Sequence, residues 1–339
     1  MRNIFLLLFL PLIGYSQQIL NHSIIHDNIQ RDYKIYIPAS YDSSIASPLV
    51  FCLHGYGGSA NSIMYYTDFN YIADTAGFIA VYPQGALLQG VSHWNVGGWT
   101  TASNIDDVGF IEILLDSISL DYNIDPNRVY STGMSNGGYM SFLLACQLSN
   151  RIAAIASVTG SMTPQTYDMC NPQHPTPILQ IHGTNDQVVP YLGDPSWTVS
   201  IHNVLQYWID YNNCNLSAET EVIADIDMSD GSNVERKSWS DCDNLVVAEH
   251  LKIYGGGHQW PGNSGNMDIH AASEIWRFFS RYDINGLIGL ETYLEEEILA
   301  PHYLIKSTDL LGRNLSTNAG GILFYFYSDG QVEKKMLIE

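Results

Sequence analysis

The chain has 339 residues and a formal net charge of −21, and 46% of its residues are hydrophobic. This length suffices for one large domain or two modest ones, and the hydrophobic content excludes a disordered chain. The chain has no basic run that could neutralise phosphates. Its acidic balance therefore excludes a nucleic-acid partner and disfavours contact with anionic membranes.

The first residues predict an export signal. Arg2 precedes an apolar run from Ile4 to Ile13, and small residues follow near Ser16. This run is too short to cross a membrane, so we expect residues 1–16 to be a signal peptide rather than a buried N-terminal helix. No later stretch reaches about 18 consecutive apolar residues. We therefore expect a mature chain without a membrane span, secreted or held at the cell surface.

The middle of the chain alternates short apolar runs with helical patterns. Each run ends at or just before a glycine and is continuously hydrophobic, which is typical of strands buried on both faces. The runs are "PLVFCLHG", "GFIAVYPQG", "NRVYSTG", "AAIASVTG" and "PILQIHG". Residues 107–122 and 137–150 between them have apolar residues at helical spacing. This order predicts an α/β fold with a mainly parallel sheet and helices on both faces.

The two ends of this pattern differ from its middle. Residues 18–42 predict an antiparallel hairpin ahead of the sheet. A last helix is predicted over 269–283, and residues 290–339 then have the pattern of short antiparallel strands joined by turns. We therefore divide the mature chain into a domain over 17–285 and a C-terminal β segment over 286–339.

The stretch "YSTGMSNGGYM" places Ser135 between Gly133 and Gly137, where a predicted strand runs into a predicted helix. A nucleophilic serine needs this placement, because a tight turn exposes its hydroxyl and the helix N-terminus favours developing negative charge. The alternative is an ordinary glycine-rich connection. The strand–turn–helix context favours the nucleophile.

A serine hydroxyl needs a base, and the base needs an acid to orient it. Asp186 follows an apolar strand in "IHGTNDQVVP", and His258 follows the last strand in "YGGGHQWPG". Both fall at the same carboxyl edge as Ser135, in the chain order Ser, Asp, His. His54 and His182 each end a strand before a glycine, which favours backbone hydrogen bonding over catalysis.

An oxyanion hole needs two backbone N–H groups aimed at one point. We expect one from Asn136, directly after the nucleophile, and one from Tyr56 in the glycine-rich loop "LHGYGGSA". The alternative for that loop is a flexible turn. Its glycines allow the close approach that an acyl oxygen requires.

Five cysteines allow at most two disulfides. Cys52 lies inside an apolar strand pattern and is predicted to be a buried free thiol. The other four allow three connectivities, of which we favour Cys214–Cys242 and Cys146–Cys170. The chain has no C-x-x-C pair, so we expect no zinc site.

Six motifs in order resemble the secreted polyhydroxybutyrate depolymerase and feruloyl esterase family of α/β-hydrolases. They are "LHGYGG", "YPQG", "DDVGFI", "NRVYSTGMSNGGYM", "HGTNDQVVPY" and "GGGHQWPG", and the resemblance covers about residues 20–282. It implies the triad Ser135, Asp186 and His258, the oxyanion donors Tyr56 and Asn136, and no metal or cofactor.

The tail has a resemblance of its own. "STDLLGR" and "GGILFYFYSDGQVEKKMLIE" resemble the C-terminal sorting domain that directs cargo through the type IX secretion system. This implies the secretion machinery as a partner. The alternative is a small accessory or carbohydrate-binding module.

Near the predicted site we expect Trp94 and Trp260 to contact substrate, since aromatic walls suit a feruloyl ring, a sugar face or a polyester chain. The sequence thus predicts a secreted serine carboxylic-ester hydrolase. Its expected substrates are feruloyl or acetyl esters of polysaccharide, or polyhydroxyalkanoate. The alternatives are a serine peptidase, or a glycan-binding surface protein on a hydrolase scaffold that has lost catalysis.

Overall fold

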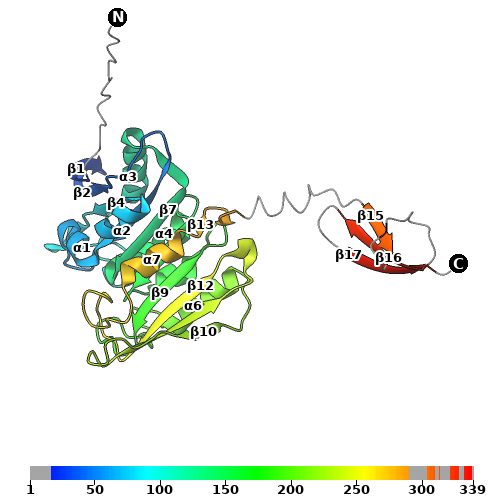
Figure 1. Cartoon of the computed structure of the whole chain (residues 1–339). Helices are drawn as coiled ribbons and strands as arrows, with labels where there is room; N and C mark the ends of the chain where they lie inside the picture. Colours follow the sequence, from blue (N-terminus) through cyan, green and yellow to red (C-terminus); the bar gives the residue numbers. More distant parts are fainter. Residues whose placement is uncertain (1–16, 290–303, 310–312, 314–320, 328–331, 338–339) are drawn as a thin grey trace, which may run out of the picture. The chain divides into compact units, whose positions relative to one another are not determined.

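A computed structural model describes residues 17–289, 304–309, 313, 321–327 and 332–337 (Figure 1). The predicted signal peptide, residues 1–16, lies outside the described residues. The chain divides into two compact units, Met1–Leu287 and Ile288–Glu339. No helix in the described part of the chain has the length and apolar character needed to cross a membrane.

Ten strands of the first unit form one sheet within the described residues. In spatial order they are β1 (Gln18–His26), β2 (Ile29–Ile37), β4 (Ile79–Pro83), β3 (Ser47–Leu53), β7 (Ile124–Met134), β8 (Ala154–Val158), β9 (Ile178–Gly183), β12 (Ala248–Tyr254), β11 (Asn233–Trp239) and β10 (Glu219–Val222). The six strands from β4 to β12 pair in parallel. The predicted hairpin β1–β2 joins one edge antiparallel, and β11 and β10 join the other.

Both faces of the parallel strands are buried. On β3, Leu49 and Phe51 face one hydrophobic cluster, whereas Val50 and Cys52 face the other. Side chains of a strand alternate between faces, so a strand covered on both sides needs apolar residues at every position. Each such Leu or Phe contributes about 1.5–3 kcal/mol on full burial. This explains the uninterrupted apolar runs in the sequence.

Helices supply the two covers (Figure 1). On one face pack α3 (Asp107–Asp121), α4 (Asn136–Gln147) and α6 (Ile201–Tyr211). On the other pack α1 (Ala60–Thr67), α2 (Phe69–Ala76) and α7 (Ala271–Phe279). Short elements lie in the loops that follow carboxyl ends of strands. They are α5 (Pro164–Met169), the hairpin of β5 (Ala86–Leu88) and β6 (Val91–His93), and the 3-10 turn η1 (Gly98–Thr100). A second 3-10 turn, η2 (Asp243–Leu245), precedes β12, and a small pair, β13 (Tyr282–Asp283) and β14 (Gly286–Leu287), ends the unit.

The sheet has a switch point between β3 and β7. From β3 the chain crosses to β4 on one side, and it later returns to β7 on the other side. Leu53, at the end of β3, pairs with Gly133 near the end of β7. The loop after β3 and the turn at Ser135 therefore leave the sheet side by side, where open α/β sheets form binding crevices.

Two disulfides confirm the favoured connectivity, Cys146–Cys170 and Cys214–Cys242. The first joins α4 to the residue that ends α5. Cys52 is a buried free thiol, as predicted, and burial raises its pKa to about 12.

In the second unit, the described residues contain β15 (Leu304–Asp309), β16 (Gly321–Tyr327) and β17 (Val332–Leu337). They pair antiparallel in that order. The antiparallel strands predicted for the tail are therefore present.

Candidate functional site

Ser135 occupies the turn between β7 and α4. Its backbone has φ +56° and ψ −119°, a conformation that residues with a side chain rarely adopt. The surrounding structure holds it there: the Ser135 N–H donates to the Val158 carbonyl across 2.8 Å. The half-buried Ser135 side chain thus stands at the N-terminus of α4.

The glycines beside Ser135 are required by crowding. A Cβ added at Gly133 would lie 2.6 Å from the carbonyl carbon of Gly137 and 2.7 Å from the carbonyl oxygen of Leu53. Both neighbours are backbone atoms that cannot move aside. The two glycines therefore let β3, β7 and α4 meet closely under the serine.

The structure brings Asp186 and His258 together. Nδ1 of His258 donates to Oδ2 of Asp186 across 2.8 Å. The other carboxylate oxygen, Oδ1, accepts the N–H groups of Val188 and Val189 at 2.8 and 2.9 Å. Because a carboxylate can only accept, Nδ1 carries the proton and Nε2 of His258 is the nitrogen able to take another.

Asp186 is 3% exposed, and its surroundings keep it ionised. Burial acts to raise its pKa, but the hydrogen bond and charge of His258, together with the Val189 N–H, outweigh burial and lower the pKa. The second neighbour, His182, lies 3.4 Å from Oδ2 and is fully buried. Burial lowers the pKa of His182, and its Nε2 lies 2.9 Å from the Val189 carbonyl oxygen. His182 therefore serves a backbone hydrogen bond, as expected.

The loop after β3 lies against Ser135. A Cβ added at Gly55 would be 4.0 Å from Oγ of Ser135. The loop is fixed at its other polar groups: the N–H of Gly57 donates to the Ser92 carbonyl, and the N–H of Gly58 to the Gly55 carbonyl. The Tyr56 N–H has no acceptor among the described residues. It is thus available to a ligand.

Asn136 is the first residue of α4, and its N–H belongs to the group that has no acceptor inside a helix. Its side chain has a different task. Oδ1 of Asn136 accepts the Trp94 N–H at 2.7 Å, and Nδ2 donates to the Trp94 carbonyl at 3.1 Å. The Trp94 indole Nε1 then donates to the His54 carbonyl at 2.8 Å. Asn136 therefore braces the loop that carries Tyr56.

The two tryptophans expected to contact substrate are too deeply buried to do so. Trp94 is 0% exposed and Trp260 is 1% exposed. The ring of Trp260 packs on Phe69 at a centroid distance of 6.1 Å. Both are core residues, and this corrects the expectation from sequence.

Other aromatic side chains take their place at the site. Tyr56 is 49% exposed, and its ring meets the half-buried Trp99 edge-on at 5.7 Å. Trp99 follows Trp94 in the same loop, "HWNVGGW", which the sequence places near the site. The sequence predicts a role for the backbone N–H of Tyr56 but not for its ring, because a glycine-rich loop indicates close backbone approach and not which side chain is exposed.

One group of side chains has the composition of a metal site. Ligand atoms of His26, Asp27 and Asp106 lie within 4.8 Å of one another. However, Oδ1 of Asp106 accepts the Gly109 N–H that begins α3, and Oδ2 faces Nε2 of His26 at 3.1 Å. Both carboxylate oxygens of Asp106 thus already have hydrogen-bond partners within the fold.

Comparisons with known proteins identify esterases as similar proteins. Residues 31–170 match a family model described as esterase PHB depolymerase. The chain is 31% identical over 259 residues, 76% of its length, to a bifunctional acetylxylan esterase/xylanase of Neocallimastix patriciarum. It is 28% identical over 281 residues to feruloyl esterase D of Neurospora crassa, covering 80% of this chain and 89% of that protein.

Among solved structures, the chain is similar to an acetyl xylan esterase from Aspergillus awamori, with a TM-score of 0.55 and 16% identity. The match covers 77% of this chain and 99% of that chain. The chain spans only 34% of the length of the Neocallimastix protein. Together these findings establish that this chain has the α/β-hydrolase fold and that its residues 31–170 are similar to esterase PHB depolymerases.

Proposed function

We propose that this protein is a secreted serine carboxylic-ester hydrolase with Ser135 as nucleophile, His258 as base and Asp186 as the orienting acid. The observation that carries the proposal is the 2.8 Å hydrogen bond from Nδ1 of His258 to Asp186. It leaves Nε2 as the proton acceptor at the sheet edge where Ser135 occupies its strained turn.

The proposed reaction has two halves. Oγ of Ser135 attacks the ester carbonyl carbon while Nε2 of His258 takes the hydroxyl proton. The N–H groups of Tyr56 and Asn136 stabilise the oxyanion. Collapse breaks the bond to the alcohol, which leaves with the proton from His258. Water then attacks the acyl-enzyme, again giving a proton to His258, and the acid is released as Ser135 recovers its proton.

For the substrate, we propose an ester linked to a polymer, with feruloyl or acetyl esters of polysaccharide ahead of polyesters. The acetylxylan and feruloyl esterases among the relatives support the first choice, and the PHB depolymerase family model supports the second. The half-exposed Tyr56 and its neighbour Trp99 offer an aromatic wall beside the proposed oxyanion donor.

For the ends of the chain, we propose that residues 1–16 direct export and that residues 286–339 are a type IX sorting domain. Mass spectrometry of protein recovered from the host's medium tests both. We expect a mature N-terminus at Gln17 and loss of the tail. An intact tail on the secreted protein would contradict the sorting role.

The first experiment measures p-nitrophenyl acetate hydrolysis by the full mature chain beside Ser135→Ala, with a phosphonate that labels active serines. We expect activity and label in the first protein and neither in the second. Equal activity in both would exclude Ser135 as the nucleophile. Preferential cleavage of a peptide amide would favour a peptidase. Tight glycan binding without label would favour a protein that only binds.

A further inference from the structure

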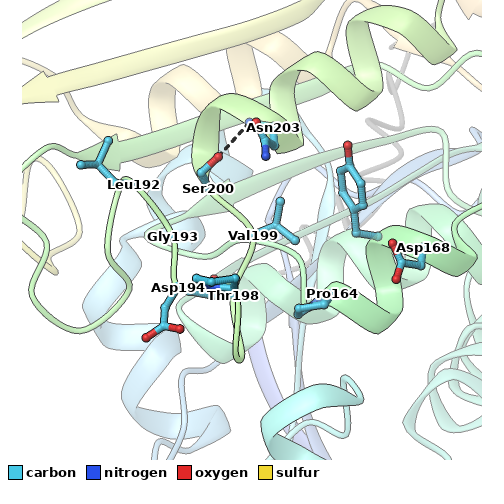
Figure 2. Close-up of a pocket in the computed structure, with 11 residues that line it drawn as sticks. Pro164, Asp168, Leu192, Gly193, Asp194, Thr198, Val199, Ser200 and Asn203 are labelled. Carbon is cyan, nitrogen blue, oxygen red and sulfur yellow. Dashed lines mark hydrogen bonds between the residues drawn. The ribbon is translucent and has the colours of Figure 1, made fainter.

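A cavity of about 290 Å³ lies between α5 and segment 192–203, which leads from β9 into α6 (Figure 2). Ligand sites begin at about this size. Its two walls follow β8 and β9 in the chain, so both belong to loops at the carboxyl edge of the sheet. Asp186 lies at the start of the second loop. The cavity is therefore built from the same connections as the proposed catalytic site.

A line of contacts joins the cavity to Ser135. Thr198 lines the cavity, and its hydroxyl shares a hydrogen bond with the hydroxyl of Tyr139, which stands one helical turn after Ser135. The Tyr139 ring meets Trp99 edge-on at 5.9 Å, and Trp99 meets Tyr56 at 5.7 Å. A wall of aromatic rings thus runs from the proposed oxyanion loop toward the cavity.

The lining has acceptors without partners. No hydrogen bond within the described residues uses the exposed carboxylate of Asp168 or the exposed side-chain amide of Asn203 (Figure 2). No lysine or arginine lines the cavity. Two carboxylates without a cation, those of Asp168 and Asp194, disfavour an anionic ligand but accept strong hydrogen bonds from hydroxyl groups. The half-buried ring of Tyr167 adds an apolar face.

The cavity is held in shape without a ligand. Gly193 has φ +72°, and a Cβ there would lie 2.5 Å from the backbone nitrogen of Ser200. The hydroxyl of Ser200 accepts the Asn203 N–H at 3.2 Å and begins α6 (Figure 2). Opposite, the disulfide Cys146–Cys170 ties the end of α5 to α4. A preformed site lowers the ordering cost of binding.

We propose that this cavity binds an uncharged sugar residue on the alcohol side of the ester, an inference that rests on the proposed esterase function. Hydroxyl groups of the sugar donate to Asp168 and to the side-chain oxygen of Asn203, and its apolar face lies on Tyr167. The acyl group does not fit here, because hydrolysis turns it into a carboxylate that the two aspartates repel. The cavity thus selects esters carried by a glycan.

The test compares two esters of the same acid, acetylated xylo-oligosaccharide and p-nitrophenyl acetate, on the full mature chain. Asp168→Ala and Asn203→Ala are each expected to raise KM for the glycan ester by about 10-fold, the effect of one lost hydrogen bond. Both kinetic constants for p-nitrophenyl acetate are expected to stay within about twofold. His202→Ala, an exposed neighbour that does not line the cavity, serves as the matched control.

If Asp168→Ala and Asn203→Ala raise KM equally for both esters, or for neither, the proposal is overturned. Wild-type protein that cleaves p-nitrophenyl acetate but not the glycan ester would overturn the sugar site and leave the esterase standing. If wild-type protein cleaves neither ester, the proposed function fails. Calorimetric titration with unesterified xylo-oligosaccharide then decides the site: binding weakened by Asp168→Ala supports it, and no binding overturns it.

Discussion

Nδ1 of His54 donates a hydrogen bond to the carbonyl oxygen of Gly55 across 2.7 Å. The N–H of Gly85 donates to Nε2 of the same ring across 2.9 Å, which assigns the proton to Nδ1. Burial lowers the pKa of His54 to about 4, so the ring is neutral at neutral pH. The Gly55 carbonyl and the Tyr56 N–H belong to one planar peptide group. Holding the carbonyl therefore fixes the direction of the proposed oxyanion donor.

This relationship predicts opposite results for two amide substitutions. His54→Asn places its NH₂ near the position of Nδ1 and keeps the donation to Gly55, whereas His54→Gln places its amide near Nε2. We expect His54→Gln to lower kcat about 100-fold, as loss of an oxyanion donor does, and His54→Asn to retain most of it. The measurement is kcat and KM on p-nitrophenyl acetate.

The control is the thermal midpoint of each variant. Similar midpoints with different kcat values separate a positioning role from a loss of folding. Equal losses of kcat in the Asn and Gln variants would contradict the role assigned to the Gly55 carbonyl.

Asp186→Asn tests the acid of the proposed triad. The amide has the same shape but can donate to His258, which favours the wrong tautomer of the ring. We expect kcat to fall about 10³–10⁴-fold with little change in KM. Asp42→Asn is the matched control, because Asp42 also accepts the N–H of the residue two positions on but is exposed and precedes β3, whose other end carries the site. A comparable loss in the control would show that the effect is not specific.

The two disulfides close loops of similar length, with sequence separations of 24 and 28 residues. Replacing either pair with alanine is expected to lower the free energy of unfolding by about 3 kcal/mol. The two disulfides should differ in their effect on KM, because only Cys146–Cys170 holds α5. The hydroxyl of Thr163, which begins α5, donates to the Val96 carbonyl, and Gln165 accepts the Gly98 N–H beside Trp99.

Loss of Cys146–Cys170 should therefore also raise KM, whereas loss of Cys214–Cys242 should not. Denaturant titration measures the free energy of unfolding, and steady-state kinetics measures KM. Unchanged KM in both double variants would exclude a role for α5 in shaping the site.

Much of this fold was predictable because its inner strands are buried on both faces. Every residue of β3 is buried, and the strand is apolar from Pro48 to Leu53, where the chain reaches the crevice. The same regularity placed Ser135, Asp186 and His258 at strand ends. That placement, together with the chain order Ser, Asp, His, predicts the pairing of His258 with Asp186.

The strands β10 and β11, at the edge opposite the predicted hairpin, escaped prediction for the opposite reason. β10 is exposed at all four positions and carries Glu219 and Glu221, so it has no apolar pattern. Its neighbour β11 is held to the sheet partly by Arg236, which pairs with Glu221, Glu249 and Glu274. Such contacts depend on residues far apart in the chain. Burial of Trp94 was equally hidden, since it depends on bonds to Asn136 and His54.

Buried neutral histidines predict that acid destabilises this protein well above the pH at which carboxylates are protonated. Burial lowers the pKa of His54 to about 4 and that of His250 to about 3. The unfolded chain takes up protons at these positions below about pH 6.5, while the folded chain does not. Stability contributed by each ring is therefore complete above that pH and is lost as pH falls toward the folded pKa.

The expected slope is up to about 1.4 kcal/mol per pH unit for each ring between roughly pH 6.5 and 4. The carboxylate of Asp186, whose pKa is lowered in the fold, adds its loss only at more acid pH. Urea unfolding at several pH values measures the slope. His250→Gln retains an amide to face Gln180 and Tyr191 but cannot titrate. The slope of its unfolding free energy against pH should therefore be shallower by the amount that one proton contributes. An unchanged slope in this variant would mean that His250 is protonated to the same extent in both states.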